Sequence, residues 1–378
     1  MQSVRIDLIA AARPNFMKVA PLFHALRDQD WCCLRLVHTG QHYDANMSDA
    51  FFRDLDLPWP DLHLGVGSGS HAVQTAGVMT AYEQVCENDR PDLIVVVGDV
   101  NSTMACALVG AKRGIKVAHL EAGLRSGDRR MPEELNRLVT DTLADILWTP
   151  SPDADENLAI EGVATDKITC VGNIMMDSYE LMRERIQASG ERERLGLEEH
   201  GYAVATLHRP SNVDAPATLT ALVRQLKAMA ARLPLVFPVH PRTRKNLEAF
   251  DLWSTLSEAP GLIVTAPLGY VDFMNLVCGA RLVVTDSGGI QEETTYLDIP
   301  CLTLRTTTER PITLTEGSNR LVKMADLDSA VDIVLAGAWP HGRRPALWDG
   351  DAAERVVADI RRRLLPAKVD ADVEASAA

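Results

Sequence analysis

Apolar positions along the chain form short β-branched runs that alternate with longer segments of helical period. The run Leu93 to Val97 has no polar position, which is typical of a strand buried on both faces of a parallel sheet. The alternation of strand and helix occurs twice along the chain. We therefore expect an α/β protein with two Rossmann-like doubly wound domains, each a parallel sheet covered by helices on both faces.

The first half of the chain predicts a compact series of strands joined by helices. We expect strands at Val4 to Ala10, Cys33 to Thr39, Leu93 to Val97 and Lys116 to Leu120. We expect helices at about Phe16 to Arg27, His71 to Glu87, Ser102 to Arg113 and Glu134 to Asp145. The segment from residue 93 to residue 120 then forms one βαβ unit.

A second series starts after Gly172 with a charged helix expected over Asn173 to Arg194. Strands are expected at Tyr202 to Leu207, Leu235 to Val239, Leu262 to Thr265, Leu282 to Thr285 and Cys301 to Leu304, with a helix at Ala217 to Ala231 among them. These patterns predict domains at residues 1–172 and 173–350, with a last helix at about 352–365 that packs back on the first domain. The tail from Pro366 is expected to fray. Ligands of doubly wound domains bind beyond the carboxyl ends of the strands, so we expect a cleft between the two domains.

Charge and targeting signals exclude several classes of protein. The 378 residues contain 38 Lys and Arg against 52 Asp and Glu, and the net charge of −14 disfavours binding to nucleic acids and to anionic membrane surfaces. No signal peptide and no run of apolar residues long enough for a membrane span is apparent, so we expect a soluble, cytoplasmic protein. Seven cysteines, an odd number without a CxxC motif, favour reduced thiols over disulfides or a zinc site.

The loop after the first strand carries two cations, Arg13 and Lys18, near a proline at a helix start. This arrangement suits a bound anion, although two ordinary solvated charges would give the same pattern. No GxGxxG motif follows this strand, and the similar stretch Gly65 to Ser70 follows no strong strand and lacks the last glycine. A nicotinamide-dependent dehydrogenase is therefore disfavoured.

Three carboxylates follow strands or open a helix in the first half. Asp99 and Glu121 come at the ends of neighbouring predicted strands, and Glu133 lies at a helix start. Asp99 alone could be a helix cap, and an acid such as Glu133 favours the helix dipole without any further function. Glu121 has no evident capping role. Together the three predict a carboxylate cluster that could perform acid/base chemistry.

Predicted strands of the second half end in two His-Arg pairs, His208-Arg209 and His240-Pro241-Arg242. A lone histidine there would more often be structural, but two such pairs favour contacts with an anion or a sugar. The strand at 282–285 runs into the sequence DSGGIQEE, whose glycines would let backbone N–H groups approach a diphosphate while an acid one turn later holds ribose hydroxyls. A simple helix-entry turn is the alternative interpretation.

Seven segments in one order carry a resemblance to a known family: ARPNFMK, GDVNST, HLEAGLRSGDRRMPEELNR, TLHRPSN, HPRT, DSGGIQEE and LRTTTERPITLTEGSN. The chain resembles the non-hydrolysing UDP-N-acetylglucosamine 2-epimerases from about residue 4 to residue 365. The resemblance implies a glycosyltransferase-B-like fold, a homodimer, no metal and no cofactor. It also implies interconversion of UDP-GlcNAc and UDP-ManNAc, by elimination of UDP to 2-acetamidoglucal and re-addition.

The resemblance also implies roles for particular residues. The catalytic set would be Asp99, Glu121, Glu133 and His208. The groups holding UDP would be Arg13, Lys18, Phe273, Ser287, Gly288, Gly289, Glu292 and Arg310. The residues on the sugar or effector side would be Gln41, His42, Arg209 and His240.

Four other functions remain open from the sequence. A relative acting on UDP-2,3-diacetamido-glucuronic acid would use the same chemistry, and a hydrolysing 2-epimerase would release free sugar and UDP. A retaining glycosyltransferase would need an acceptor site, and it would not need three carboxylates around the sugar. A nucleotide-sugar sensor would bind without turnover, which the complete presumed catalytic set disfavours.

Overall fold

The structure, a computed structural model, describes residues 3–11, 13–40 and 55–365, with only the backbone of Arg13 and Pro14. The chain divides into two compact units. The first contains residues 1–123, 135–177 and 351–378, and the second contains residues 124–134 and 178–350. The domain bounds 1–172 and 173–350 stay a prediction.

The described residues of the first unit form a seven-stranded parallel sheet in the order β3-β2-β1-β4-β5-β6-β7. Its strands are β1 (Val4–Ala10), β2 (Cys32–His38), β3 (Leu62–His63), β4 (Leu93–Val97), β5 (Lys116–Leu120), β6 (Ile146–Thr149) and β7 (Ile168–Cys170). All five residues of β4 are buried, as the apolar run predicts. The short strands β3, β6 and β7 were not predicted, because runs of two to four residues carry little periodicity.

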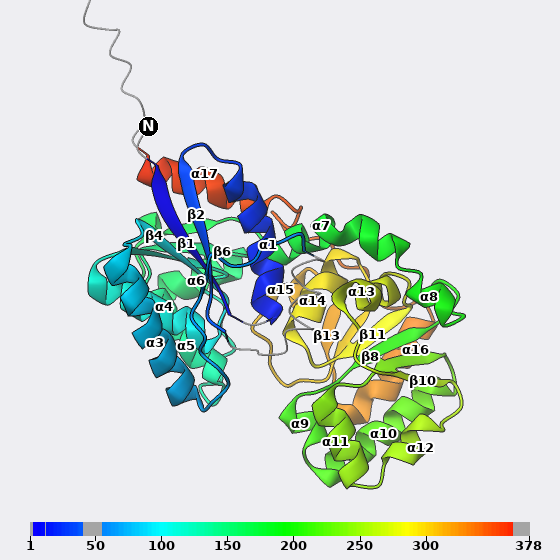
Figure 1. Cartoon of the computed structure of the whole chain (residues 1–378). Helices are drawn as coiled ribbons and strands as arrows, with labels where there is room; N and C mark the ends of the chain where they lie inside the picture. The colour runs from blue at the N-terminus through cyan, green and yellow to red at the C-terminus, as the bar shows by residue number, and fades with distance from the viewer. Residues whose placement is uncertain (1–2, 12, 41–54, 366–378) are drawn as a thin grey trace, which may run out of the picture. The chain divides into compact units, whose positions relative to one another are not determined.

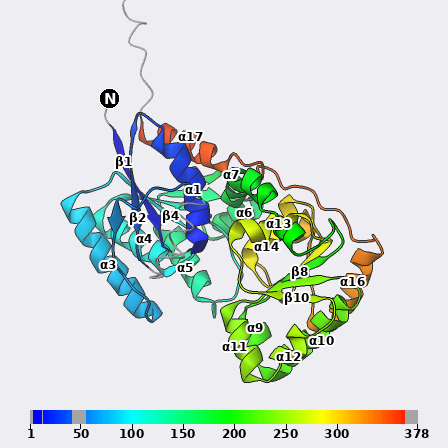
Figure 2. The same ribbon diagram turned by 45° about the vertical axis from the view of Figure 1, so that its right-hand side comes forward.

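Helices cover both faces of this sheet. They are α1 (Arg13–Arg27), α3 (His71–Asn88), α4 (Asn101–Arg113), α5 (Pro132–Leu143), α6 (Pro152–Ile160) and α17 (Ala352–Leu364), with a short 3₁₀ turn at Thr165–Lys167. Helix α17 lies beside α1 (Figure 1) and α3 lies beside α4 (Figure 2). Right-handed crossovers from the adjacent strands β1 and β4 run outward in opposite directions, so α1 and α4 cover opposite faces.

The second unit repeats this plan with a six-stranded parallel sheet in the order β10-β9-β8-β11-β12-β13 among its described residues. Its strands are β8 (Ala203–Thr206), β9 (Leu235–Pro238), β10 (Leu262–Thr265), β11 (Leu282–Thr285), β12 (Cys301–Thr303) and β13 (Asn319–Leu321). The outward order of strands from a central pair is that of a doubly wound sheet. The predicted fold class, two doubly wound α/β domains, is confirmed.

The helices of the second unit differ from expectation at one place. They are α8 (Glu191–Arg194), α9 (Pro210–Val213), α10 (Pro216–Ala230), α11 (Pro241–Ala249), α12 (Trp253–Ser257), α13 (Tyr270–Cys278), α14 (Gly288–Tyr296), α15 (Ile312–Thr315) and α16 (Leu327–Leu335), with a 3₁₀ turn at Met324–Asp326. The single helix predicted over Asn173 to Arg194 is wrong: α7 (Ile174–Ala188) ends before α8 begins. Gly190 separates them with φ +70, a left-handed conformation that favours glycine and stops a helix.

Each unit has its own apolar core. In the first unit, buried side chains of α3 and α4 pack on the sheet around Ile94, Val96 and Val117. In the second, α10 and α16 pack on the strands β8, β9 and β11. Among the described residues, no helix is long and apolar enough to cross a membrane.

Candidate active site

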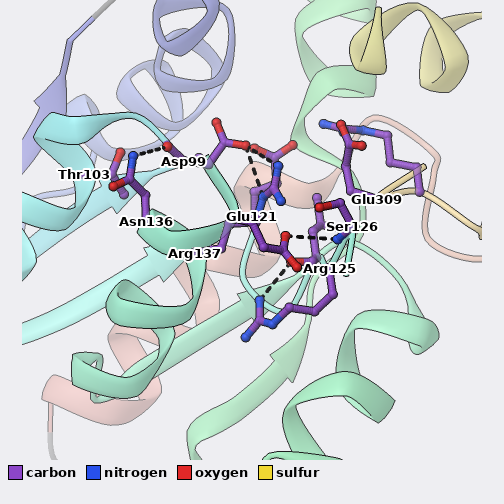
Figure 3. A network of polar contacts seen from close by, with 12 residues as sticks. Asp99, Thr103, Glu121, Arg125, Ser126, Asn136, Arg137 and Glu309 are labelled. Atoms are coloured by element: carbon purple, nitrogen blue, oxygen red, sulfur yellow. Dashed lines mark hydrogen bonds and ion pairs between the residues drawn. The ribbon is translucent and has the colours of Figure 1, made fainter. Parts of the chain in front are cut away.

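Asp99 lies just beyond the end of β4, where an arginine and an asparagine of α5 hold it (Figure 3). Arg137 donates to the Asp99 carboxylate from Nη2 over 2.7 Å and from Nε over 3.1 Å, and Asn136 donates to its carbonyl over 2.8 Å. The N-cap of α4 is Val100, so Asp99 is not the helix cap that the sequence allowed. A buried guanidinium beside the carboxylate favours its ionised form.

Glu121 follows β5 in a left-handed backbone conformation with φ +75, which is uncommon for any residue other than glycine. The amides of Glu121 and Ala122 both donate to the carbonyl of Trp148, each over 3.0 Å. The Glu121 carboxylate, 6% exposed, forms an ion pair with Lys18 of α1. A catalytic candidate and a UDP-binding candidate are thus in direct contact.

Gly98 makes room for this ion pair. It adopts φ +68, and a Cβ at this position would lie 3.3 Å from Glu121 Oε2 and 3.3 Å from Lys18 Nζ. Gly98 directly precedes Asp99, so the structure brings Asp99, Glu121 and Lys18 to one edge of the first sheet. The sequence predicts that Asp99 and Glu121 share this edge, because each follows a predicted strand of one βαβ unit, but it does not predict the contact with Lys18.

Other residues expected near this edge are described less fully. The side chain of Arg13 lies outside the described part of the chain, as do Gln41 and His42. Helix α1 begins at Arg13 rather than at about Phe16, because a proline is tolerated in the first turn of a helix. The proposed contacts of these three residues stay predictions.

Glu133 is exposed in the first turn of α5 and is grouped with the second unit. Its neighbour Glu134 is buried and accepts from the amides of Ser126 over 3.0 Å and Gly127 over 2.9 Å. Glu134 therefore closes the loop that leads to the helix, whereas Glu133 points to solvent. The catalytic role of Glu133 stays a prediction.

His208 lies beyond the end of β8 and is held by Asp286, a fully buried residue beyond β11. The Asp286 carboxylate accepts from the His208 amide over 3.0 Å and lies 3.2 Å from His208 Nδ1. A carboxylate at this distance favours a proton on Nδ1, and the remaining nitrogen Nε2 could then accept a proton. Burial lowers the pKa of His208, so the ring is neutral near pH 7.

Two of the three other members of the His-Arg pairs, His240 and Arg209, lie near His208. The His240 ring lies 5.2 Å from the His208 ring, centroid to centroid, and its Nδ1 accepts from the Arg242 amide at the start of α11. Arg209 donates its amide to Asp286 Oδ2 and its Nε to the Asp286 carbonyl, each over 2.9 Å. Asp286 thus fixes the turn that carries both His208 and Arg209.

Helix α14 starts at Gly288, as the DSGG motif predicts. Ser287 is its N-cap and makes no side-chain capping bond there, and open space surrounds the position that a Cβ of Gly289 would take. A Cβ at Gly288 would lie 2.8 Å from Arg310 Nη1, so the guanidinium lies beside the helix start. Free backbone N–H groups and a nearby arginine can receive a diphosphate.

Arg310 is held by two acidic residues. Its Nε lies 2.8 Å from Glu292 Oε1, and its Nη1 donates to Glu309 Oε1 over 2.7 Å. The expected UDP-binding residues Glu292 and Arg310 are therefore partners of each other, and both are buried. Phe273 is half-buried in α13, and its contact with uracil stays a prediction.

The sequence motifs alone assign no role to several residues that shape these sheet edges. They are Asn136 and Arg137 at Asp99, the buried pair His119 and Asp141, Asp286 at His208, and Glu293 beside Glu292. Burial raises the pKa of Glu293 to about 8. All of them except Asp141 lie within the quoted segments, but the spacing of a motif does not indicate which partners they contact, since most of those partners lie far away along the chain. Among the described residues, no group of three or more His, Cys, Asp or Glu side chains could hold a metal ion.

Comparisons with known proteins support one family. The family model of UDP-N-acetylglucosamine 2-epimerase matches residues 24–361. The UDP-N-acetylglucosamine 2-epimerase of Methanocaldococcus jannaschii is 40% identical over 94% of this chain and 98% of that protein. The UDP-2,3-diacetamido-2,3-dideoxy-D-glucuronate 2-epimerase of Pseudomonas aeruginosa is 39% identical over 85% of this chain and 89% of that protein.

A solved structure gives the same result for the fold. The crystal structure of the Methanocaldococcus jannaschii UDP-GlcNAc 2-epimerase in complex with UDP-GlcNAc and UDP is similar with a TM-score of 0.86 and 37% identity. The match covers 95% of this chain and 100% of that chain. The fold, the matched family model and these relatives agree, and the chain belongs to the UDP-N-acetylglucosamine 2-epimerase family.

Proposed function

We propose that this enzyme interconverts UDP-GlcNAc and UDP-ManNAc by eliminating UDP to 2-acetamidoglucal and adding it back. The observation that carries the proposal is the placement of two charge-paired carboxylates, Asp99 and Glu121, at one edge of the first sheet. Acid/base chemistry at a carbon needs such groups, and a binding protein does not.

The chemistry of the substrate explains why UDP must leave. The C2 hydrogen of a nucleotide sugar is not next to a carbonyl group, so a carboxylate is too weak a base to remove it directly. Breaking the bond between C1 and the phosphate oxygen develops positive charge at C1 and makes the C2 proton acidic. A carboxylate can then take the C2 proton, which leaves the glycal and UDP.

The leaving diphosphate carries negative charge. Groups that stay positively charged throughout the reaction can stabilise it. Lys18 in the first unit, and Arg310 with the N–H groups at the start of α14 in the second, supply this type of charge. We assign Ser287, Gly288, Gly289 and Arg310 to the diphosphate on this basis. The interaction with Glu292 keeps the Arg310 guanidinium in place.

Return of the proton to the opposite face of C2 requires a second acid/base group. Asp99, Glu121, Glu133 and His208 are the candidates for the two positions. The neutral His208 ring, oriented by Asp286, could take a proton or contact the leaving phosphate. A homodimer remains a prediction that follows from the family resemblance, and a cytoplasmic location remains a prediction from the sequence pattern and the cysteines.

A second substrate has support from one observation. The relative from Pseudomonas aeruginosa that acts on a UDP-2,3-diacetamido-glucuronate is almost as similar to this chain as the UDP-GlcNAc 2-epimerase from Methanocaldococcus jannaschii. The same elimination and addition would apply to this sugar, since the change at C3 and C6 leaves C1 and C2 unaltered. Identity alone does not separate the two substrates.

Proton NMR of the purified protein with each UDP-sugar alone tests the proposal. We expect UDP-GlcNAc to give UDP-ManNAc without an acceptor present. Turnover of the diacetamido-glucuronate only would assign the second substrate, and release of free ManNAc would indicate a hydrolysing enzyme. Binding without any conversion of either sugar would contradict an epimerase function.

A further inference from the structure

A histidine and an aspartate form a buried pair behind the two carboxylates of the first unit. His119 on β5 is 0% exposed and Asp141 on α5 is 2% exposed. His119 Nδ1 lies 2.6 Å from Asp141 Oδ1, and His119 Nε2 lies 2.8 Å from the carbonyl of Gly98. Asp141 Oδ2 accepts from the Gly123 amide over 3.0 Å.

The two ends of this network are the loops that carry the catalytic candidates. Gly98 directly precedes Asp99, and Gly123 is two residues after Glu121. We infer that Asp141 is a positioning residue that, together with His119, holds both loops in place for the reaction. This inference rests on the proposed function, because it assigns the roles of Asp99 and Glu121 from that reaction.

The loop at Glu121 needs such support. A non-glycine residue in the left-handed region costs about 1 kcal/mol or more, and Glu121 has φ +75. Gly123 follows with φ +79, and a Cβ there would lie 2.4 Å from the carbonyl of Ala154. The bonds from residues 121 and 122 to the Trp148 carbonyl, and from Gly123 to Asp141, hold this conformation.

The contacts of the His119 ring show which hydrogen bonds a substitute for Asp141 must make. Asp141 lies at Nδ1 and the Gly98 carbonyl lies at Nε2, so each ring nitrogen has one hydrogen-bond partner. An asparagine at position 141 could replace all three bonds. Its oxygen would accept from Gly123 and its amide would donate to Nδ1 of a neutral ring, while Nε2–H would still donate to Gly98.

The Asp141→Asn substitution distinguishes a positioning role of Asp141 from a role in proton transfer. A proton relay or a required negative charge would be lost in Asp141→Asn, as it would in Asp141→Ala. A positioning role would be lost only in Asp141→Ala, because alanine can neither accept from Gly123 nor donate to the ring. The comparison of the two variants therefore decides between the roles.

The test measures kcat, KM, UDP affinity and amide hydrogen exchange of peptides covering residues 119–124. For Asp141→Ala we expect kcat to fall about tenfold or more, with UDP affinity within about twofold and faster exchange in this segment. For Asp141→Asn we expect kcat and exchange within about twofold of the wild type. Leu26→Ala, a core truncation near the far end of α1, is the control for lost stability alone, and its kcat should be unchanged.

A double variant covers the case in which Asp141→Ala does not fold. His119→Phe combined with Asp141→Asn keeps an aromatic ring and carries no charge, and it removes both contacts of the His119 ring while the bond from the Gly123 amide can remain, so kcat should again fall. Full kcat in Asp141→Ala or in the double variant would overturn the inference, as would loss of activity in Asp141→Asn. A wild type that converts no UDP-sugar would contradict the proposed function instead, and the exchange data would still decide whether the pair holds the loops.

Discussion

The guanidinium of Arg137 donates from both Nη2 and Nε to one oxygen of Asp99, over 2.7 and 3.1 Å. Arg137 is 3% exposed, whereas the Asp99 carboxylate is 31% exposed. A cation that is fixed in the protein interior thus holds a carboxylate that solvent or substrate can reach. Such a pair orients the carboxylate, which the proposed role at the sugar requires.

Replacing Arg137 should therefore impair turnover through its effect on Asp99. For Arg137→Gln we expect kcat to fall about tenfold, because the Asp99 side chain loses its bidentate partner. The matched control is Arg113→Gln, which removes a more exposed arginine paired with Glu87 in the same unit. Steady-state kinetics of both variants check the prediction, and equal kcat in the two would contradict it.

Glu121→Gln tests the proposed acid/base group directly. We expect turnover to fall by about a hundredfold, the scale of a lost acid/base group, with UDP affinity nearly unchanged. Gln can still accept a hydrogen bond from Lys18, so loss of the fold is not expected. Glu83→Gln on the exposed part of α3 is the control. Full activity in Glu121→Gln would assign the residue a structural role only.

The pKa of Glu293 predicts how stability depends on pH. Burial raises this pKa from 4.5 to about 8, so the folded protein holds a proton that the unfolded chain releases. The contribution to stability is present below the unfolded pKa and is lost as pH rises through the folded pKa. Glu293→Gln has no carboxyl group to ionise at this position, so it does not lose this stability. The difference between its denaturant midpoint and that of the wild type should therefore increase between about pH 5 and pH 9.

Denaturant unfolding at several pH values measures this difference. The exposed residue Glu258 provides the control, since Glu258→Gln should leave the pH profile unchanged. Each pKa unit corresponds to about 1.4 kcal/mol, so the effect is well within measurement. A constant difference between Glu293→Gln and the wild type at all pH values would mean that the carboxyl group is not protonated in the folded protein.

The sequence predicts five strands best, four inside their sheets and one, β10, at a sheet edge. The bounds of β1, β4, β5, β10 and β11 match the predicted residues, because each is a run of the length and apolar character that a buried parallel strand needs. The strands β3 and β7, of two and three residues, have no such pattern. Over Asn173 to Arg194 the sequence predicts one helix where the structure has two, because the charged helical pattern continues across the break at Gly190.

The candidate site was predictable in part. Strand order alone places Asp99 and Glu121 at neighbouring strand ends, β4 and β5, and the structure agrees. The pairing of Asp99 with Arg137 joins residues 38 positions apart in the sequence and depends on how α5 packs, which periodicity does not give. The left-handed backbone of Glu121 likewise has no sequence signal, because glycine is the residue that usually marks it.

Activity should survive chelation of divalent metals. In the proposed mechanism, Lys18, Arg310 and backbone N–H groups provide the charge for the leaving diphosphate, and none of them needs a metal. We expect turnover of UDP-GlcNAc in EDTA to equal turnover with added Mg²⁺. A strict requirement for a divalent ion would show that these groups do not neutralise the diphosphate.

The fate of the C2 hydrogen tests the mechanism itself. If one group removes the proton and a different group returns one to the opposite face, the returned proton should come largely from solvent. UDP-ManNAc formed in D₂O should then carry deuterium at C2, and recovered UDP-GlcNAc should gain it as equilibrium is approached. An oxidation and reduction at another carbon could also introduce deuterium, so the intermediate must be sought as well. Long incubations should release small amounts of 2-acetamidoglucal and UDP, and early product without deuterium at C2 would exclude elimination and re-addition with two bases.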